Sequence, residues 1–211
     1  MQHTHSSAPR SVRIGGVTKE ELLKGLAEGH VEVNAAGHLL FADERFCTAE
    51  KPQWLSVTQV SVASLGLEQG GVMAQVMSAA EVHGLSPCPL ELAPHLRLQF
   101  AEQDDGATGL SISKNTAPPG SLTVISVPLS SDDEVPKGFY LRRIDGKRWL
   151  RGYTSCARHV WQPEDQLLFL AAESAILQRR TFKDAWMRGA SQPMPFWMNR
   201  AGGQGGGMGP C

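Results

Sequence analysis

The chain has 211 residues, of which 41% are hydrophobic and 19% are charged, and no apolar run approaches the length that spans a bilayer. This composition supports a packed core and argues against wholesale disorder. Twenty Lys and Arg against 21 Asp and Glu give a formal net charge of -1, which excludes a histone-like polycation and an acidic solvating chain.

The balanced charge conceals an asymmetry along the chain. Residues 1–134 contain 8 basic and 16 acidic residues, whereas residues 135–211 contain 12 basic and 5 acidic residues. Such an asymmetry indicates either an anionic partner for the basic part or docking of the two halves on each other.

The four cysteines indicate a reducing compartment. Cys47, Cys88, Cys156 and Cys211 show no C-x-x-C spacing and are too sparse for a disulfide framework. The first 13 residues lack the apolar stretch of a signal peptide. We therefore expect a cytoplasmic protein without a membrane partner.

The first part of the chain predicts a flexible leader over residues 1–16 and a small helical element over 17–53. Thr18 and Glu21 have the spacing of a capping box, and Gly29 is expected to end the helix that follows. A further helical turn is expected near residues 38–41, and Pro52 marks a boundary.

An α+β domain is predicted over residues 54–191, with a central helix over 72–83 and a mostly antiparallel sheet of about five strands. Asp145-Gly146 predicts a tight hairpin that pairs Leu141 with Leu150. A helix is expected from about Glu173, and residues 192–211 are expected to form a disordered Pro- and Gly-rich tail. Strands are predicted at 57–62, 95–100, 110–114, 122–127, 139–144, 147–153 and 167–170.

Several segments carry a resemblance to a family of small uncharacterised bacterial proteins. The main one runs Leu85-Ser-Pro-Cys88-Pro-Leu-Glu91-Leu-Ala-Pro-His95-Leu-Arg97-Leu-Gln99, with Leu92-Ala93 where the family pattern has Val-Gly. Residues 18–24, 61–66 and 161–165 are similar too. The resemblance implies a soluble bacterial protein with one α+β domain, and it carries no known activity.

Chemically versatile side chains gather between Glu81 and Arg97. Cys88, Glu91 and His95 are possible zinc ligands, and Cys88 with a histidine is a possible nucleophile and base for a hydrolase. Neither a recognised metal spacing nor a catalytic-cysteine signature is present, so we expect no metal and no cofactor. The structural interpretation makes Cys88 a buried apolar side chain and pairs Glu91 with Arg97.

The predicted hairpin carries a second candidate site. A two-residue turn would place the following side chains on the face opposite Leu141 and Leu150: Tyr140, Arg142, Lys147, Trp149 and Arg151. Interleaved arginine and aromatic side chains suit phosphates and stacked bases. The alternatives are cation–π contacts that only stabilise the sheet, or docking on the acidic half.

These patterns favour a non-enzymatic cytoplasmic binding module whose partner is nucleic acid or another polyanion. A hydrolase that uses residues 81–97 is one alternative. Another is a protein–protein adaptor that uses the aromatic C-terminal region with Trp186, Phe196 and Trp197.

Overall fold

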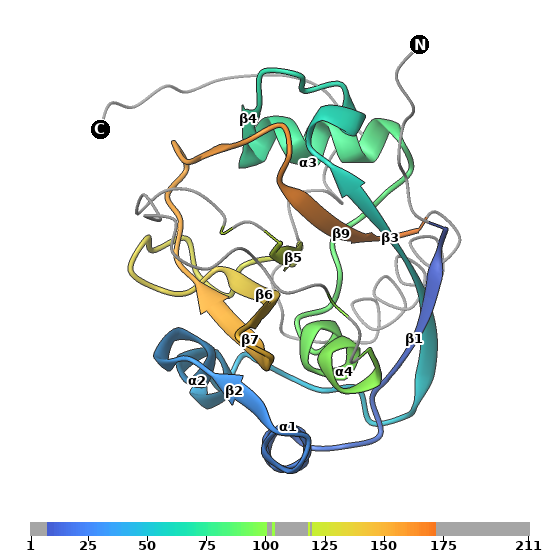
Figure 1. Ribbon diagram of the computed structural model, residues 1–211, viewed down its shortest axis with the longest axis vertical. Helices are drawn as coiled ribbons and strands as arrows, with labels where there is room; N and C mark the ends of the chain where they lie inside the picture. Colours follow the sequence, from blue (N-terminus) through green and yellow to red (C-terminus); the bar gives the residue numbers. More distant parts are fainter. Residues whose placement is uncertain (1–7, 101–102, 104–117, 119, 172–211) are drawn as a thin grey trace, which may run out of the picture. The chain divides into compact units, whose positions relative to one another are not determined.

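A seven-stranded sheet forms the framework of the computed structural model (Figure 1), which describes residues 8–100, 103, 118 and 120–171. All of these residues lie in Met1–Ile176, one of the two units into which the chain divides. In sheet order the strands are β1 (Arg10–Ile14), β3 (Gln53–Ser61), β9 (Gln166–Leu170), β5 (Leu122–Val124), β6 (Gly138–Ile144), β7 (Lys147–Tyr153) and β2 (Val31–Val33).

The sheet is mixed but mostly antiparallel. Only the β9–β5 and β7–β2 pairs are parallel among its six pairings. A separate two-stranded ribbon joins β4 (Gly71–Val72) to β8 (Val160–Trp161). The predicted α+β class is therefore confirmed, whereas the predicted number of about five strands was too low.

Within the described residues, four α-helices and one short 3-10 helix flank the sheet. They are α1 (Lys19–Glu28), α2 (Ala35–Ala42), α3 (Met73–Val82), α4 (Leu92–Gln99) and the 3-10 helix η1 (Ala63–Leu65). The predicted capping box is present at α1, where the Glu21 N–H donates to Thr18 Oγ1 (3.2 Å) and the Thr18 N–H donates to Glu21 Oε2 (2.8 Å). None of the helices in the described residues combines the length and apolar composition needed to cross a membrane.

The two faces of the sheet bury two separate cores. Along β9, Leu168 and Leu170 belong to the core that also contains buried residues of α1, α2 and α4. Leu167 and Phe169 point into the second core, which contains buried residues of α3. A strand covered on both faces has a continuous apolar sequence, which explains why the run at 167–170 does not alternate.

The leader prediction was wrong for residues 10–14, because they form the edge strand β1 beside β3. The element predicted at 17–53 contains α1 and α2 but also contributes β2 to the other edge of the sheet. The strand predicted at 110–114, the helix from Glu173 and the tail at 192–211 lie outside the described residues.

The strand predicted at His95–Phe100 was also wrong, because residues 92–99 form α4. The alternation of Leu96, Leu98 and Phe100 resembles a strand, but Leu92 and Leu96 also have helical spacing and both are buried. Pro94 is compatible with this helix because it lies in the first turn, where a backbone N–H has no partner within the helix.

A polar stripe on α4 holds the outer edge of β1. Gln99 bonds the backbone of Arg13 twice: the Arg13 N–H donates to Gln99 Oε1 (2.9 Å), and Gln99 Nε2 donates to the Arg13 carbonyl (2.6 Å). One turn earlier, His95 Nε2 accepts the Gly15 N–H (3.1 Å). These side chains satisfy an edge that would otherwise offer free backbone groups to another chain.

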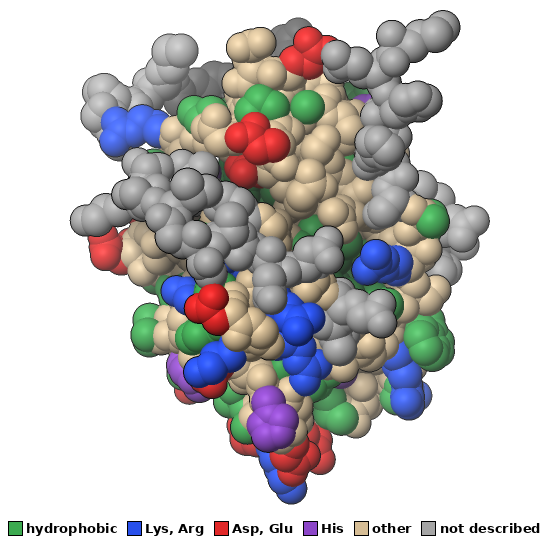
Figure 2. Space-filling view, viewed as in Figure 1, with side chains coloured by type: hydrophobic (Ala, Val, Ile, Leu, Met, Phe, Trp, Pro, Cys, Tyr) green, Lys and Arg blue, Asp and Glu red, His purple; other side chains and the backbone are tan. Residues whose placement is uncertain are grey.

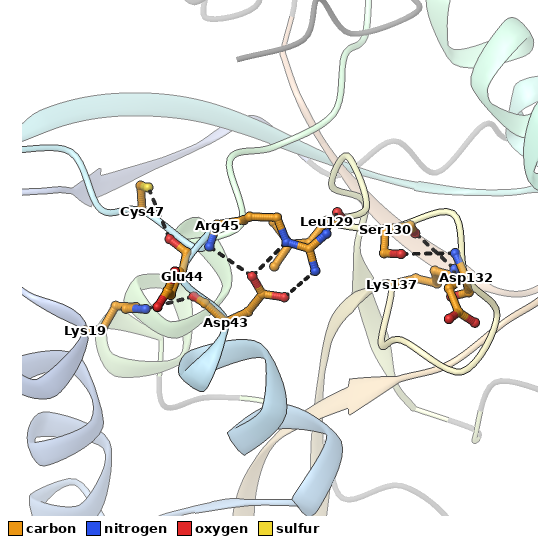
Figure 3. A network of polar contacts seen from close by, with 9 residues as sticks. All are labelled: Lys19, Asp43, Glu44, Arg45, Cys47, Leu129, Ser130, Asp132 and Lys137. Carbon is orange, nitrogen blue, oxygen red and sulfur yellow. Dashed lines mark hydrogen bonds and ion pairs between the residues drawn. The ribbon is translucent and has the colours of Figure 1, made fainter. Parts of the chain in front are cut away.

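A second polar network connects α1, the end of α2 and the acidic loop at 130–136 (Figure 3). The Arg45 guanidinium donates to both carboxylate oxygens of Asp43 (2.9 and 2.6 Å) and to the Leu129 carbonyl (2.6 Å), and it lowers the pKa of Asp43 to about 2. Within the loop, Lys137 Nζ donates to the carbonyls of Ser130 and Asp132. The network fixes this loop, whose acidic side chains remain exposed.

We expect Gln99→Ala to lower the free energy of unfolding by about 1–3 kcal/mol, because the two hydrogen bonds to Arg13, which each contribute about 0.5–1.5 kcal/mol, are lost. Urea unfolding followed by circular dichroism measures this change. Gln69→Ala, at an exposed glutamine, is the control and should change the stability by less than about 0.5 kcal/mol. Equal effects of the two substitutions would contradict the role given to Gln99.

Candidate functional site

Cys88, Glu91 and His95, the residues of the alternative hydrolytic or metal site at 81–97, are all buried. Cys88 lies in the first core with its Sγ 3.7 Å from the Leu168 carbonyl, and burial raises the pKa of its thiol well above the ordinary value. Such a thiol does not supply a thiolate near neutral pH. In the described residues, no three His, Cys, Asp or Glu side chains lie where they could hold a metal ion.

Glu91 and His95 do come together, but both bond the backbone. Glu91 Oε2 lies 3.6 Å from His95 Nε2, and Glu91 Oε1 accepts the Ala49 N–H (3.0 Å). His95 Nε2 already accepts the Gly15 N–H, so neither side chain faces an open site. Arg97, predicted as the partner of Glu91, instead donates to Gln103 Oε1 (2.7 Å) and the Phe100 carbonyl (2.6 Å).

The hairpin of β6 and β7 has the predicted register. Asp145 and Gly146 both have positive φ, 50° and 75°, as a type I′ turn requires. Leu141 pairs with Leu150 in the first core, and Arg142 pairs with Trp149 and Tyr140 with Arg151 on the opposite face. We call the five residues predicted on that face the basic-aromatic strip: Tyr140, Arg142, Lys147, Trp149 and Arg151.

The strip differs in detail from the prediction. Arg142 is buried, with 6% of its surface exposed, whereas Tyr140, Trp149 and Arg151 are half-buried and Lys147 is exposed. A cation–π contact runs along β7, where the Arg151 guanidinium lies 5.0 Å from the centroid of the Trp149 ring. We call this pair, an aromatic ring with a guanidinium stacked on it, the Arg151–Trp149 shelf.

A cavity of about 640 Å³ adjoins the strip. The β-sheet register aligns Thr123, Tyr140 and Arg151 in one row across β5, β6 and β7. Thr123 and Tyr140 line the cavity, so Arg151 lies directly beside it. The lining residues are Pro118, Ser121, Thr123, Tyr140, Tyr153, Thr154, Ser155, Cys156, Arg158, His159, Val160, Trp161 and Gln162.

Aromatic rings form one wall of this cavity. Tyr153 and His159 both meet the Trp161 ring edge to face, with centroids 5.9 and 5.0 Å away. Burial raises the pKa of the Tyr153 phenol and lowers the pKa of the His159 imidazole. Both side chains are therefore neutral near neutral pH, and Arg158 is the permanent cation among the lining residues.

Hydrogen-bond donors outweigh carboxylate acceptors among the described residues of the strip and the cavity. Arg151 Nε–H and Trp161 Nε1–H are buried and have no hydrogen-bond acceptor in the described part of the chain. None of the described residues that line the cavity is Asp or Glu. The Arg158 guanidinium and the hydroxyl and amide groups of the lining can donate hydrogen bonds, so this arrangement suits a ligand rich in acceptor oxygens.

Positive charge also gathers near the hairpin tip. Figure 2 shows Lys and Arg side chains in the region where Figure 1 places β7 and α4. Arg148 donates to the Gly29 carbonyl at the end of α1. The buried Arg97 has its pKa lowered to about 10 by burial and by the positive charges of Arg148 and Arg143. Exposed acidic residues oppose this pattern: Asp145 lies in the turn itself, and Glu32 lies opposite Trp149.

Sequence reasoning missed the cavity entirely. Its walls come from Pro118, Ser121 and Thr123, from Tyr140 and from lining residues between Tyr153 and Gln162, which are far apart in the chain. The density of hydroxyl, thiol, imidazole and guanidinium side chains between Thr154 and Gln162 was the available indication.

No model of a known protein family matches the chain, and neither a curated protein nor a solved structure is significantly similar to it. The resemblance to a bacterial family therefore stays a prediction, and the functional argument depends on the geometry of the site alone.

The turn at the rim of the cavity contains a carboxyl group that titrates near neutral pH. Asp165 Oδ2 accepts the Gln162 N–H (2.8 Å) in a buried position. Burial raises the pKa of this carboxyl from 3.8 to about 6; the bond from Gln162 opposes this shift, and the negative charge of Glu164 adds to it.

We expect Asp165→Asn to stabilise the protein increasingly from pH 4 to pH 7. A carboxyl whose pKa is raised by folding favours the folded state below its unfolded pKa, and this contribution is lost as the pH rises through about 6. An asparagine carries no charge and can still accept the Gln162 N–H. Urea unfolding of both proteins at pH 4, 5, 6 and 7 measures the difference; a constant or shrinking difference would contradict the assignment.

Proposed function

We propose that the protein binds single-stranded nucleic acid through the basic-aromatic strip. The observation that carries the proposal is the Arg151–Trp149 shelf beside a cavity that has no carboxylate among its described lining residues. A nucleic acid supplies what this surface lacks, namely phosphate and base oxygens as acceptors and planar rings that stack on tryptophan.

The depth of Trp149 favours a single strand over a duplex. Its ring is half-buried between neighbouring strands, so a base must leave its stack to contact it. Lys147 at the exposed tip and Arg151 beside the ring are placed to contact phosphates on either side of a stacked base. This binding requires no catalytic group.

The proposal takes the protein to be cytoplasmic. The three cysteines in the described residues, Cys47, Cys88 and Cys156, are all unpaired. Free thiols persist in a reducing compartment, where single-stranded nucleic acid is also present.

We expect Trp149→Ala to weaken binding of a fluorescein-labelled oligothymidylate or oligouridylate by about 1–3 kcal/mol, the usual contribution of one stacked base. Arg151→Ala should reduce the magnitude of the slope of log Kd against log salt by about 0.7, because one phosphate contact is lost. Fluorescence anisotropy from 25 to 300 mM salt measures both quantities.

Lys24→Ala is the charge-matched control, because Lys24 lies on α1 with 76% of its side chain exposed and pairs only with Glu28 among the described residues. It should leave affinity and salt slope unchanged. The proposal is wrong if the wild-type protein binds neither oligonucleotide at 25 mM salt, or if Lys24→Ala and Arg151→Ala have the same effect.

A second prediction has the opposite sign. Glu32 lies opposite Trp149 at the edge of the sheet, where its carboxylate repels phosphates. We expect Glu32→Gln to tighten oligonucleotide binding up to about fivefold at low salt, which corresponds to a Coulomb energy of about 1 kcal/mol or less. The same anisotropy titration measures this change, and weaker binding by Glu32→Gln would mean that the ligand does not cross this edge.

A further inference from the structure

We infer that the cavity beside the strip binds one nucleoside monophosphate unit, either as a free mononucleotide or as the terminal nucleotide of a strand that lies on the strip. The second form rests on the proposed function. The first does not, because a mononucleotide can occupy the cavity without touching Lys147 or Trp149.

The size of the cavity suits one such unit. Its volume of about 640 Å³ falls within the range of about 300–1,000 Å³ for pockets that enclose small ligands. The row Thr123–Tyr140–Arg151 connects the cavity to the strip without an intervening element. A strand on the strip can therefore continue into the cavity.

The charge of the lining residues suits a single phosphate. Arg158 is exposed at the cavity and is the permanent cation among the described lining residues, while His159 is neutral near neutral pH. A phosphate monoester carries about −1.5 to −2 at neutral pH, so one guanidinium and nearby hydroxyl donors match it. A triphosphate carries more negative charge than the single guanidinium among the described lining residues can match.

The remaining lining groups suit a base and a ribose. The hydroxyl groups can each donate and accept a hydrogen bond, and the Gln162 amide does both with separate atoms. They belong to Ser121, Thr123, Tyr140, Tyr153, Thr154 and Ser155. Tyr153, His159 and Trp161 supply ring surfaces.

The cysteines of the protein allow a direct test. Cys156 lines the cavity and is half-buried, Cys47 is exposed elsewhere, and Cys88 is buried in the core. We would measure the rate of iodoacetamide alkylation at each cysteine by peptide mass spectrometry, with and without 5 mM AMP, GMP, CMP or UMP. Adenosine and inorganic phosphate are the comparison ligands, because adenosine has only the base and sugar of a mononucleotide and inorganic phosphate only its phosphate.

The expected result is that at least one mononucleotide slows alkylation of Cys156 fivefold or more, with Cys47 unaffected, while adenosine and phosphate give less protection. Arg158→Gln should raise the mononucleotide concentration needed for half-maximal protection tenfold or more. Tyr140→Phe, which removes the hydroxyl and keeps the ring, should also raise this concentration. Lys24→Gln should have no effect. Cys88 reports on the fold, since it stays unreactive in any variant that remains folded. Absence of protection by all four mononucleotides, together with no heat of binding by calorimetry, would overturn the inference.

Oligonucleotides with and without a terminal phosphate separate this inference from the proposed function. Protection of Cys156 by a 5′- or 3′-phosphorylated strand, but not by the unphosphorylated strand, assigns the cavity to a strand end. Protection by mononucleotides without any oligonucleotide binding would uphold the cavity and overturn the strip. Oligonucleotide binding that is sensitive to Trp149→Ala but leaves Cys156 unprotected would uphold the strip and overturn the cavity.

Discussion

The two-residue turn at Asp145 and Gly146 is the constraint on which the rest of the site depends. Both residues adopt positive φ, and the turn sets the register in which Leu141 faces Leu150. Because successive side chains of a strand point to opposite faces, a slip of one residue would send Trp149 and Arg151 into the core and the leucines to the surface. The burial of Leu141 and Leu150 on one face therefore stabilises the register that places the strip on the other face, although neither leucine contacts a ligand.

The two faces of the sheet treat polar groups differently. On the face covered by α1, α2 and α4, Glu91, His95 and Gln99 each bond the backbone of another segment. On the other face, Arg158 and hydroxyl side chains such as those of Ser121 and Thr123 line the cavity. Polar groups on the first face stabilise the fold, whereas the cavity on the second face presents groups that a ligand can contact.

Local patterns predicted the elements whose geometry is determined by neighbours in the sequence. The capping box of Thr18 and Glu21, the end of α3 near Gly84 and the hairpin at Asp145-Gly146 are of this kind. Strands β1 and β2 are short and owe their conformation to pairing with β3 and β7, which no local pattern reveals. The leucines of α4 fit both the alternation of a strand and the spacing of a helix. The burial of Leu92 and Leu96, which lie four residues apart, favours the helix. The strip could be predicted because one hairpin contains it, whereas the cavity could not, because its walls converge only in the folded sheet.

The central claim is that the strip and the cavity form one ligand-binding surface. The most direct measurement is a titration of ¹⁵N-labelled protein with a 5′-phosphorylated oligonucleotide, followed by backbone amide and indole N–H chemical shifts. We expect shifts concentrated on the five residues of the strip, on Thr123 and on residues 153–162, together with the indole groups of Trp149 and Trp161, and none on α1 or β1. Shifts concentrated on α1, α4 or β1, or no shifts at saturating oligonucleotide, would contradict it.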